Sequence, residues 1–222
     1  RAMKRRSRLI LIGDADQLPS VGAGNILHDL LACDRFTTIR LTDIFRQSEQ
    51  SNIIVNAHRI NEGKMPLFPA GASDFFLMRR SYEDEIVPTL CSLIQTRLPR
   101  AYGKDIVERI QVIAPSRRGS AGVDRINLSL QACLNPPSPE KQEVSYRSTV
   151  FREGDRVMQI RNDYELQWCK DGIDGCGAFN GDVGEIEEID RVAETLTVLF
   201  EDGRSAVYDF DIYSNTPLTA AR

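Results

Sequence analysis

The first two-thirds of the chain alternate short apolar runs with segments of helical periodicity. Apolar residues three and four positions apart lie on one helix face, whereas short β-branched runs favour strands. The runs predict strands at Leu9–Ile12, Thr37–Leu41, Phe75–Met78 and Ile110–Ala114. The periodic segments predict helices at Asn25–Ala32 (with Asn25 as the cap), between a Ser51 cap and Gly63, at Glu83–Arg97 and at Val123–Leu134. This alternation favours a parallel sheet covered by helices.

The pattern changes after Glu143, where no helical period appears. Short apolar runs are separated by turn signals such as Glu201-Asp202-Gly203. They predict strands at Gly154–Ile160, Gly181–Ile189, Leu196–Phe200 and Ser205–Phe210. Such a pattern is typical of a small antiparallel barrel of roughly 60–70 residues, a size at which an isolated domain is marginally stable.

The composition is that of an ordinary globular protein, with 41% hydrophobic and 27% charged residues. No apolar run approaches the roughly 20 residues that a membrane-spanning helix needs. The five cysteines are odd in number and scattered, and CKDGIDGC lacks the ligand spacing of a zinc site. We therefore expect reduced thiols, a cytoplasmic location, and neither a metal site nor a membrane contact.

Charge is distributed unevenly along the chain, whose formal net charge is −4. Residues 144–222 carry eight Lys/Arg against sixteen Asp/Glu, a net charge of −8, and the rest of the chain is net positive. Bulk charge therefore does not predict nucleic-acid binding. Any such contact has to come from local arrangements, mostly in the first two-thirds.

The segment LILIGDADQLPSVGAGN directs polar side chains to the end of its predicted strand. Asp14 and Gln17 would lie in the crevice where open α/β sheets bind ligands. A glutamine there can accept a hydrogen bond from a water and donate one to a phosphate oxygen without adding charge. Two alternatives stay open. One is a metal-binding strand with Asp14 on Mg²⁺, although Gly13 intervenes, and the other is an ordinary strand followed by an Asp-rich turn.

Several motifs, in order, resemble superfamily 1 DNA helicases of the RecD/TraA branch, which includes the alpha subunit of exodeoxyribonuclease V. LILIGDADQLPSVGAGNILHDLL resembles motif III and LTDIFRQ motif IV, and SNIIVNAHRINEG resembles the continuation of motif IV. VIAPSRRGSAGVDRIN resembles the loop and helix of the second RecA-like domain. GDRVMQIRNDY and AFNGDVGEIEEID resemble its inserted SH3-like barrel. The resemblance extends from Leu9 to about Phe210.

The resemblance implies an α/β fold: partial RecA-like domains of the P-loop NTPase type, with an inserted small antiparallel SH3-like β-barrel. The implied divisions are the last strand and helix of domain 1A at residues 1–36, part of domain 2A at 37–143, the 2B barrel at 144–213 and a tail at 214–222. The implied activity is ATP-dependent translocation on single-stranded DNA, 5′→3′, with duplex unwinding in recombination and repair. Single strands, duplex junctions and other subunits of a nuclease–helicase complex are the implied partners.

The resemblance also assigns roles around ATP. Gln17 would contact the γ-phosphate or its attacking water, and Asp14 would support that network near the Mg²⁺ ion. Arg46 would reach the γ-phosphate as an arginine finger, since its fork of donors matches phosphate oxygens. Without the LTDIFRQ context, an ion pair of Arg46 with a neighbouring acid would be the simpler interpretation.

Two helical segments offer candidate DNA contacts. The helix entrance in PSRRGSAG presents Ser116, Arg117, Arg118 and backbone N–H groups, a natural phosphate site. Asn56 and His58 could reach DNA from the helix after motif IV, although a capped helix with a structural histidine is about as plausible.

In the barrel, a polar and aromatic strip could follow a single strand. The residues of this strip are Gln159, Asn162, Tyr164, Phe179 and Asn180. For the two aromatic residues, core packing is slightly the better interpretation. The acidic charge of the region makes it a guide surface at most.

No phosphate-binding loop of the form G-x-x-x-x-G-K-[ST] occurs in the chain. We therefore expect a fragment that neither binds ATP tightly nor hydrolyses it alone, with ATP and Mg²⁺ belonging to the full-length protein. Two alternatives to a RecD-like helicase stay open: a non-catalytic DNA- or protein-interaction module, and the helicase part of a conjugative relaxase. Nuclease chemistry has no support, because no acidic metal cluster is recognisable.

Overall fold

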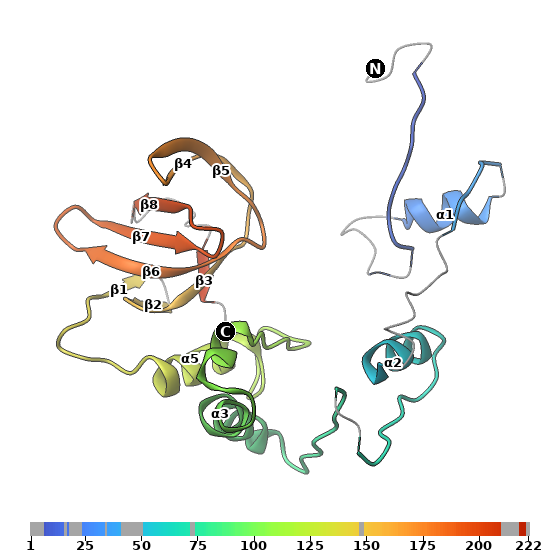
Figure 1. The fold of residues 1–222 in the computed structure, drawn as a ribbon, viewed down its shortest axis with the longest axis horizontal. Coiled ribbons are helices and arrows are strands. Elements are labelled where there is room, and N and C mark those ends of the chain that lie inside the picture. The colour runs from blue at the N-terminus through green and yellow to red at the C-terminus, as the bar shows by residue number, and fades with distance from the viewer. Residues whose placement is uncertain are drawn as a thin grey trace. The chain divides into compact units, whose positions relative to one another are not determined.

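The structure is a computed structural model that describes residues 7–15, 17, 24–33, 35–40, 51–71, 74–146, 149–209 and 218–220. The chain divides into two compact units, residues 1–79 and residues 80–222 (Figure 1).

The unit of residues 1–79 contains two helices, both predicted from the sequence. They are α1 (Ile26–Ala32) and α2 (Asn52–Asn61). Asn25 and Ser51 occupy the expected N-cap positions, but neither side chain bonds to its own helix. The helix predictions and the two N-cap positions are therefore confirmed, although neither cap residue forms a side-chain capping hydrogen bond.

The strands expected in this unit do not form in its described residues. The segments 9–12, 37–40 and 75–78 have no paired neighbour, and a strand needs one to satisfy its N–H and C=O groups. Their apolar side chains are correspondingly exposed, with Ile10 at 80% and Ile39 at 85%. In the described part of this unit, no apolar side chain is buried.

The unit of residues 80–222 begins with a helical stretch longer than predicted. A 3₁₀ turn (Glu83–Glu85), α3 (Ile86–Ser92), a π-helical turn (Leu93–Arg97) and α4 (Leu98–Tyr102) follow one another. In the π turn, the Leu98 N–H bonds to Leu93 O, five residues back. This widening admits Pro99, which has no N–H and would crowd an ordinary helical turn. The expected end at Arg97 is therefore wrong by about one turn.

A second helical layer packs on α3. It comprises a 3₁₀ segment (Lys104–Arg109) and α5 (Val123–Leu134), the latter with the predicted bounds. Residues 110–114 are irregular rather than a strand, yet the side chains of Ile110, Val112 and Ala114 pack against this core. The buried members of the core are Val87, Ile94, Ile126 and Leu130.

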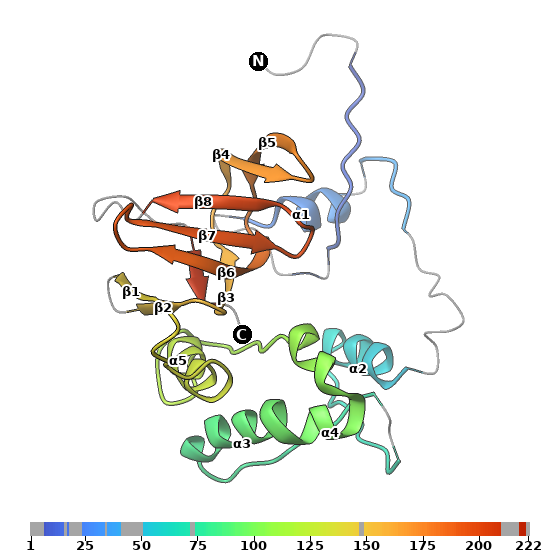
Figure 2. The same ribbon diagram turned by 60° about the vertical axis from the view of Figure 1, so that its left-hand side comes forward.

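The rest of the unit is antiparallel β-structure that curls on itself (Figure 2). The strands are β1 (Glu143–Tyr146), β2 (Thr149–Arg152), β3 (Arg156–Gln159), β4 (Asp163–Lys170), β5 (Ile173–Ala178), β6 (Val183–Asp190), β7 (Thr195–Phe200), β8 (Ser205–Asp209) and β9 (Leu218–Ala220). β1 and β2 pair with each other, and the remaining strands form one sheet in the order β5-β4-β8-β7-β6-β3-β9. The predicted strands correspond to β3, β6, β7 and β8, and the antiparallel SH3-like domain is confirmed as a curled sheet.

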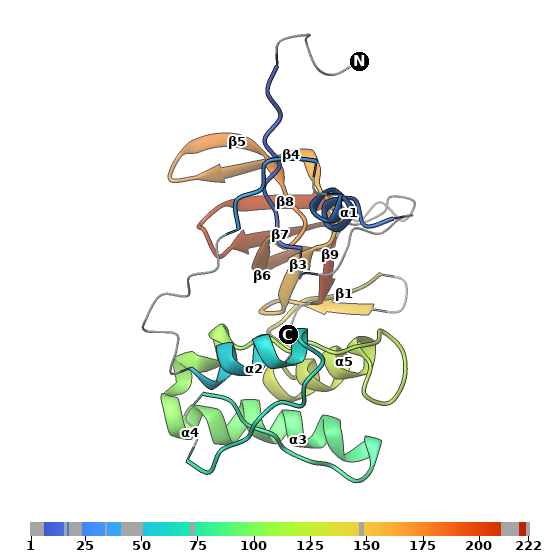
Figure 3. The ribbon, with the colours of Figure 1, turned by 90° about the vertical axis from the view of Figure 1, so that its right-hand side faces the viewer.

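The β4–β5 hairpin was not predicted, because its strands lack a clear apolar alternation. Trp168 faces Gly175 across the hairpin, and a Cβ at Gly175 would lie 2.3 Å from the indole ring. Only a glycine leaves room for the ring there. The hairpin and the helices α3–α5 lie at opposite ends of their unit (Figure 3).

A buried polar network joins α5 to the barrel. The Asp155 carboxylate is 2% exposed and accepts hydrogen bonds from Gln131 (2.5 Å) and Asn135 (2.8 Å) at the end of α5. The Arg152 guanidinium donates to the carbonyl of Asn135 and pairs with Glu143 at 2.6 Å. Helix and barrel are therefore held by specific polar contacts as well as by apolar packing.

Across the described residues, the structure has no helix that is both long enough and apolar enough to cross a bilayer.

Candidate nucleotide and nucleic-acid contacts

Asp14 and Gln17 lie together beyond the extended segment that begins the described chain. Gln17 Nε2 donates a hydrogen bond to Asp14 Oδ2 at 3.0 Å, and both side chains are exposed. This bond orients the amide, because the nitrogen faces the carboxylate and the oxygen remains available as an acceptor. The structure thus brings together two of the three residues expected around the γ-phosphate.

Gly13 lies against α1. A Cβ at this position would come within 2.9 Å of Leu27 Cδ2, so the glycine allows the helix to approach the segment closely. Gly13 also separates the apolar run from Asp14, which is the departure from a metal-binding strand noted in the sequence.

Arg46, the expected arginine finger, lies outside the described residues.

Asn56 has a structural role in the unit of residues 1–79. It is 1% exposed, donates from Nδ2 to Leu67 O at 2.8 Å, and accepts from Leu67 N at 2.6 Å. Both ends of its amide are therefore occupied by the backbone of the loop that follows α2. These contacts argue against a DNA contact by Asn56 and favour the structural alternative.

His58, on the same helix, is exposed and lies in the last turn of α2. Its exposure leaves the ring accessible to a ligand, and the DNA contact stays a prediction.

Asp74 takes the place of a side-chain cap at the start of α2. Its carboxylate accepts from Ser51 Oγ (2.7 Å), Asn52 Nδ2 (2.8 Å) and Ile53 N (3.4 Å). Hydrogen bonds from Asn52 and then from Ser51 hold the pKa of Asp74 below its usual value. A residue distant in sequence therefore supplies the negative charge that a helix N-terminus favours.

The loop before α5 folds back on the helix and uses the N–H groups expected to face a phosphate. Val123 N donates to Ser116 O at 3.0 Å, and Asp124 N donates to Arg117 O at 3.1 Å. Ser116 Oγ donates to Arg118 O at 3.0 Å. These two N–H groups are therefore occupied within the loop, and the phosphate contact of this helix entrance stays a prediction.

The guanidinium groups of the loop remain available. The Arg117 side chain is 82% exposed and lies 3.8 Å from Asp124, and Arg118 is exposed as well. Gly122 gives the loop its compact shape, because a Cβ there would lie 2.6 Å from Arg117 O and Arg118 O. Any phosphate contact here would depend on the two arginine side chains.

The aromatic residues of the expected strip lie on the surface. Tyr164 is 67% exposed and Phe179 46%, and their rings meet edge to face with centroids 5.9 Å apart. The interpretation that slightly favoured core packing is therefore wrong for both. Gln159, by contrast, is 0% exposed and accepts a hydrogen bond from Tyr208 OH at 2.9 Å, so it belongs to the core.

The two asparagines of the strip differ in what they can offer. Asn162 donates to Tyr164 OH at 3.2 Å and accepts from Asn180 N at 2.9 Å, so its amide positions its neighbours. Asn180 is exposed, and among the described residues its side chain forms no hydrogen bond. The structure therefore brings together four of the predicted residues: two exposed rings, one supporting amide and one accessible amide.

Arg204 and Asp182, which the sequence analysis missed, support this group. Asp182 Oδ2 accepts from Phe179 N at 3.0 Å and from Arg204 Nη2 at 2.7 Å. The available signal was the single tryptophan, Trp168, because a guanidinium stacks readily on an indole ring.

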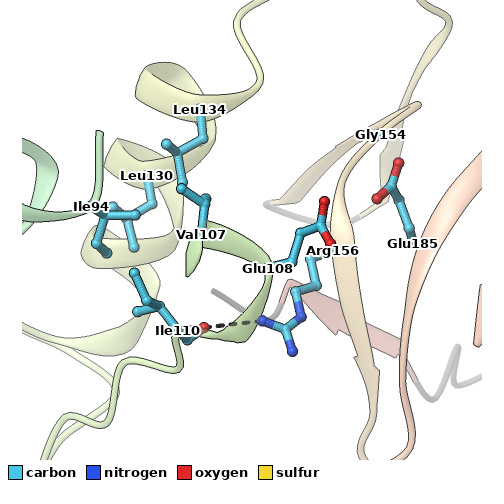
Figure 4. Close-up of a pocket in the computed structure, with 9 residues that line it drawn as sticks. All are labelled: Ile94, Val107, Glu108, Ile110, Leu130, Leu134, Gly154, Arg156 and Glu185. Carbon is cyan, nitrogen blue, oxygen red and sulfur yellow. Dashed lines mark hydrogen bonds between the residues drawn. The ribbon is translucent and has the colours of Figure 1, made fainter. Parts of the chain in front are cut away.

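A pocket of roughly 210 Å³ lies where the helices meet the barrel (Figure 4). Arg156 reaches across it to Ile110 O at 3.0 Å and pairs with Glu201 at 2.6 Å. The remaining charged lining groups, Glu108 and Glu185, are acidic, so the pocket does not suit a phosphate. Its other walls are Ile94, Val107, Leu130, Leu134 and Gly154.

Within the described ranges, no three or more His, Cys, Asp or Glu side chains gather in a way that could hold a metal ion.

Two family models match the chain. Residues 126–200 match the SH3 domain of ATP-dependent RecD-like DNA helicases, and residues 1–74 match an AAA domain.

Curated relatives match over most of the chain. It is 31% identical over 195 residues to the ATP-dependent RecD2 DNA helicase of Deinococcus radiodurans, covering 88% of this chain and 24% of that protein. It is 25% identical over 194 residues to the RecBCD enzyme subunit RecD of Mycolicibacterium smegmatis, covering 83% of this chain and 32% of that protein. The chain thus spans between a quarter and a third of these relatives.

Among solved structures, unliganded Pif1 from Bacteroides sp. shares 16% identity with a TM-score of 0.30, covering 66% of this chain and 40% of that one. A TM-score this low says nothing about a shared fold. The family and relative matches agree with the order of the sequence motifs. The resemblance to the RecD-like DNA helicases is thereby confirmed, and the chain carries an AAA-domain segment and a RecD-like helicase SH3 domain.

Proposed function

We propose that the chain is a segment of an ATP-dependent DNA helicase that moves 5′→3′ on single-stranded DNA. The observation that carries this proposal is the hydrogen bond from Gln17 Nε2 to Asp14 Oδ2. It fixes an uncharged amide with its oxygen free to accept, as a sensor of a nucleotide's terminal phosphate requires. Bound ATP and Mg²⁺ supply the phosphoryl transfer in such motors.

The residues proposed around ATP have separate tasks. Gln17 would orient the attacking water through its oxygen, and Asp14 would hold the amide in that orientation. Arg46 neutralises charge that develops on the γ-phosphate, because a guanidinium stays charged and matches phosphate oxygens in pairs.

The exposed apolar segments support a larger assembly around this chain. Strands of a parallel sheet are covered on both faces and read as continuous apolar runs, as residues 9–12 do. Ile10 and Ile12 are 80% and 95% exposed in the described structure. We propose that further strands and helices of the motor cover them.

Single-stranded DNA is the proposed track. Arg117 and Arg118 supply exposed charge for its phosphates, His58 supplies an accessible ring, and Tyr164 and Phe179 supply stacking surfaces for its bases. Duplex junctions and the other subunits of a nuclease–helicase complex are the proposed further partners.

The test is the DNA-stimulated ATPase activity of the full-length helicase. Gln17→Ala should lower kcat by about 10²–10³-fold, as loss of one oriented catalytic group does, and Arg46→Ala by about 10³-fold or more. Gln167→Ala, which removes an exposed glutamine from β4, is the matched control and should retain the wild-type rate. Wild-type rates in the first two variants would refute these roles, and would favour a non-catalytic interaction module.

A further inference from the structure

Arg204, which immediately precedes β8, is a nearly buried cation with three hydrogen-bond acceptors around it. Its side chain is 12% exposed and donates to Gly177 O (2.8 Å), Asp182 Oδ2 (2.7 Å) and Asp202 Oδ2 (2.7 Å). The guanidinium carbon lies 4.9 Å from the Phe200 ring centroid and 5.7 Å from that of Trp168.

These partners lie on both sides of the turn that carries Phe179 and Asn180. Gly177 precedes the turn and Asp182 follows it, and Asp182 also accepts the Phe179 N–H at 3.0 Å. Trp168 Nε1 donates to the same Gly177 carbonyl at 3.1 Å. Arg204 therefore fixes both ends of the segment that presents the exposed ring.

Burial of the charged Arg204 side chain is unfavourable, so packing alone does not explain why an arginine stands at this position. Desolvating a guanidinium costs several kcal/mol, and an apolar side chain would fill the same space without that cost. Burial opposes the charge of Arg204, yet hydrogen bonds with Asp182 and Asp202 raise its pKa. The charge is therefore retained, and two of its three hydrogen bonds, those to Gly177 O and Asp182 Oδ2, flank the turn.

We propose that Arg204 and Asp182 are positioning residues that hold Phe179 for stacking against an unpaired nucleobase. The inference rests on the proposed function, in which the chain contacts single-stranded DNA. It adds that this end of the barrel binds bases and leaves the phosphates to other parts of the protein.

The charges around the turn agree with base contact. Residues 144–222 carry a net charge of −8, and the Asp182 carboxylate bonds to the Phe179 N–H in the turn itself. A phosphate contact releases counterions and weakens steeply with salt, whereas stacking of a neutral base on an aromatic ring does not. Binding energy from Phe179 should therefore persist as the salt concentration rises.

The experiment measures binding of the chain to an oligodeoxythymidylate that carries one 2-aminopurine, whose fluorescence falls on stacking. Phe179→Ala should weaken binding about tenfold, by an equal factor at low and high salt, and should abolish the quenching. Arg204→Lys and Asp182→Asn should reproduce most of both losses.

The matched control is Arg156→Lys. Arg156 also bonds one carbonyl and one carboxylate, those of Ile110 and Glu201, but has no recorded contact with the turn. The Arg156→Lys variant should retain the quenching of 2-aminopurine, even if its melting temperature changes. In the Phe179→Ala background, Arg204→Lys should cause little further loss of DNA binding. A merely structural role of Arg204 would instead produce an additional loss.

A second readout is the emission of Trp168, the only tryptophan in the chain. DNA should alter it in the wild type and in Arg156→Lys, but not in Arg204→Lys or Asp182→Asn. In case Arg204→Lys unfolds the sheet, Asp182→Asn tests the same contact with the guanidinium in place.

The DNA contact of Phe179 and the positioning role of Arg204 and Asp182 are tested separately. Unchanged binding in Phe179→Ala would refute the DNA contact of the barrel and the inference with it. A loss in Phe179→Ala, with both Arg204→Lys and Asp182→Asn behaving like Arg156→Lys, would refute the positioning role alone.

Discussion

Gln131 donates a hydrogen bond to the buried carboxylate of Asp155 across 2.5 Å, and this contact ties the last turn of α5 to the barrel. Asp155 also accepts from Asn135 and from the Arg152 N–H at 2.9 Å. The match to the RecD-like SH3 domain begins at Ile126, so it includes most of α5.

Asp155→Ala should lower the free energy of unfolding of the chain by roughly 3 kcal/mol, because it leaves several buried donors without an acceptor. Urea denaturation followed by circular dichroism measures the change. Asp174→Ala removes an exposed aspartate from β5 and should change stability by less than about 0.5 kcal/mol. Equal effects of the two substitutions would show that the network contributes nothing specific.

Asn56→Ala should release the loop that follows α2, because the backbone N–H and C=O of Leu67 both lose their partner. Hydrogen exchange of the Leu67 amide should accelerate by about tenfold or more, the equivalent of one lost hydrogen bond. Asn61→Ala, at the exposed end of the same helix, is the control. An unchanged exchange rate in Asn56→Ala would return this residue to the candidate DNA contacts.

Local signals predicted the helices well. Val123–Leu134 has the bounds expected from its apolar spacing, and α1 and α2 follow their predicted starts. The strands expected before residue 115 did not appear, because a strand depends on neighbours that a local pattern does not contain. Residues 110–114 show this clearly, since they pack on the helices without joining a sheet.

The candidate site was predictable in its residue types but not in its supporting contacts. Asp14 and Gln17 were expected together and do bond to each other. Burial of Asn56 and exposure of Tyr164 depend on which segments fold over them, and the sequence does not specify that. Arg204 was missed for the same reason, because its partners come from β4, β5 and β7 and from the turns that contain Asp182 and Asp202.

The start of α2 should weaken in acid. The pKa of Asp74 is depressed below 3.8 by the hydrogen bonds from Asn52 and Ser51, so its contribution is fully present above that value. It is lost as the pH falls below 3.8 and through the folded pKa. Protection of the Val55 amide, which bonds to Ser51 O, should fall in this window and should lose this pH dependence in Asp74→Asn. Identical pH profiles in wild type and variant would contradict the assignment.

Gly122→Ala should displace the arginine loop. Its Cβ would lie 2.6 Å from two backbone oxygens, which cannot move as a side chain does, so overpacking of roughly 1–3 kcal/mol is expected. If Arg117 and Arg118 contact phosphates, affinity for single-stranded DNA should fall together with the salt dependence of binding. Ser120→Ala, at an exposed position of the same loop, should leave both unchanged. Wild-type affinity and salt dependence in Gly122→Ala would remove the loop from the DNA-binding surface.

Cys91 should resist alkylation at neutral pH. Burial, and then a hydrogen bond with Cys133, raise the pKa of the Cys91 thiol from 9.0 to about 11. Only the thiolate is nucleophilic, so two pKa units lower the reactive fraction about 100-fold. Iodoacetamide labelling followed by mass spectrometry should therefore modify the exposed Cys169 and Cys176 long before Cys91. Cys133→Ala removes the hydrogen bond and should accelerate labelling of Cys91, whereas equal rates for all these thiols would refute the proposed environment of α3 and α5.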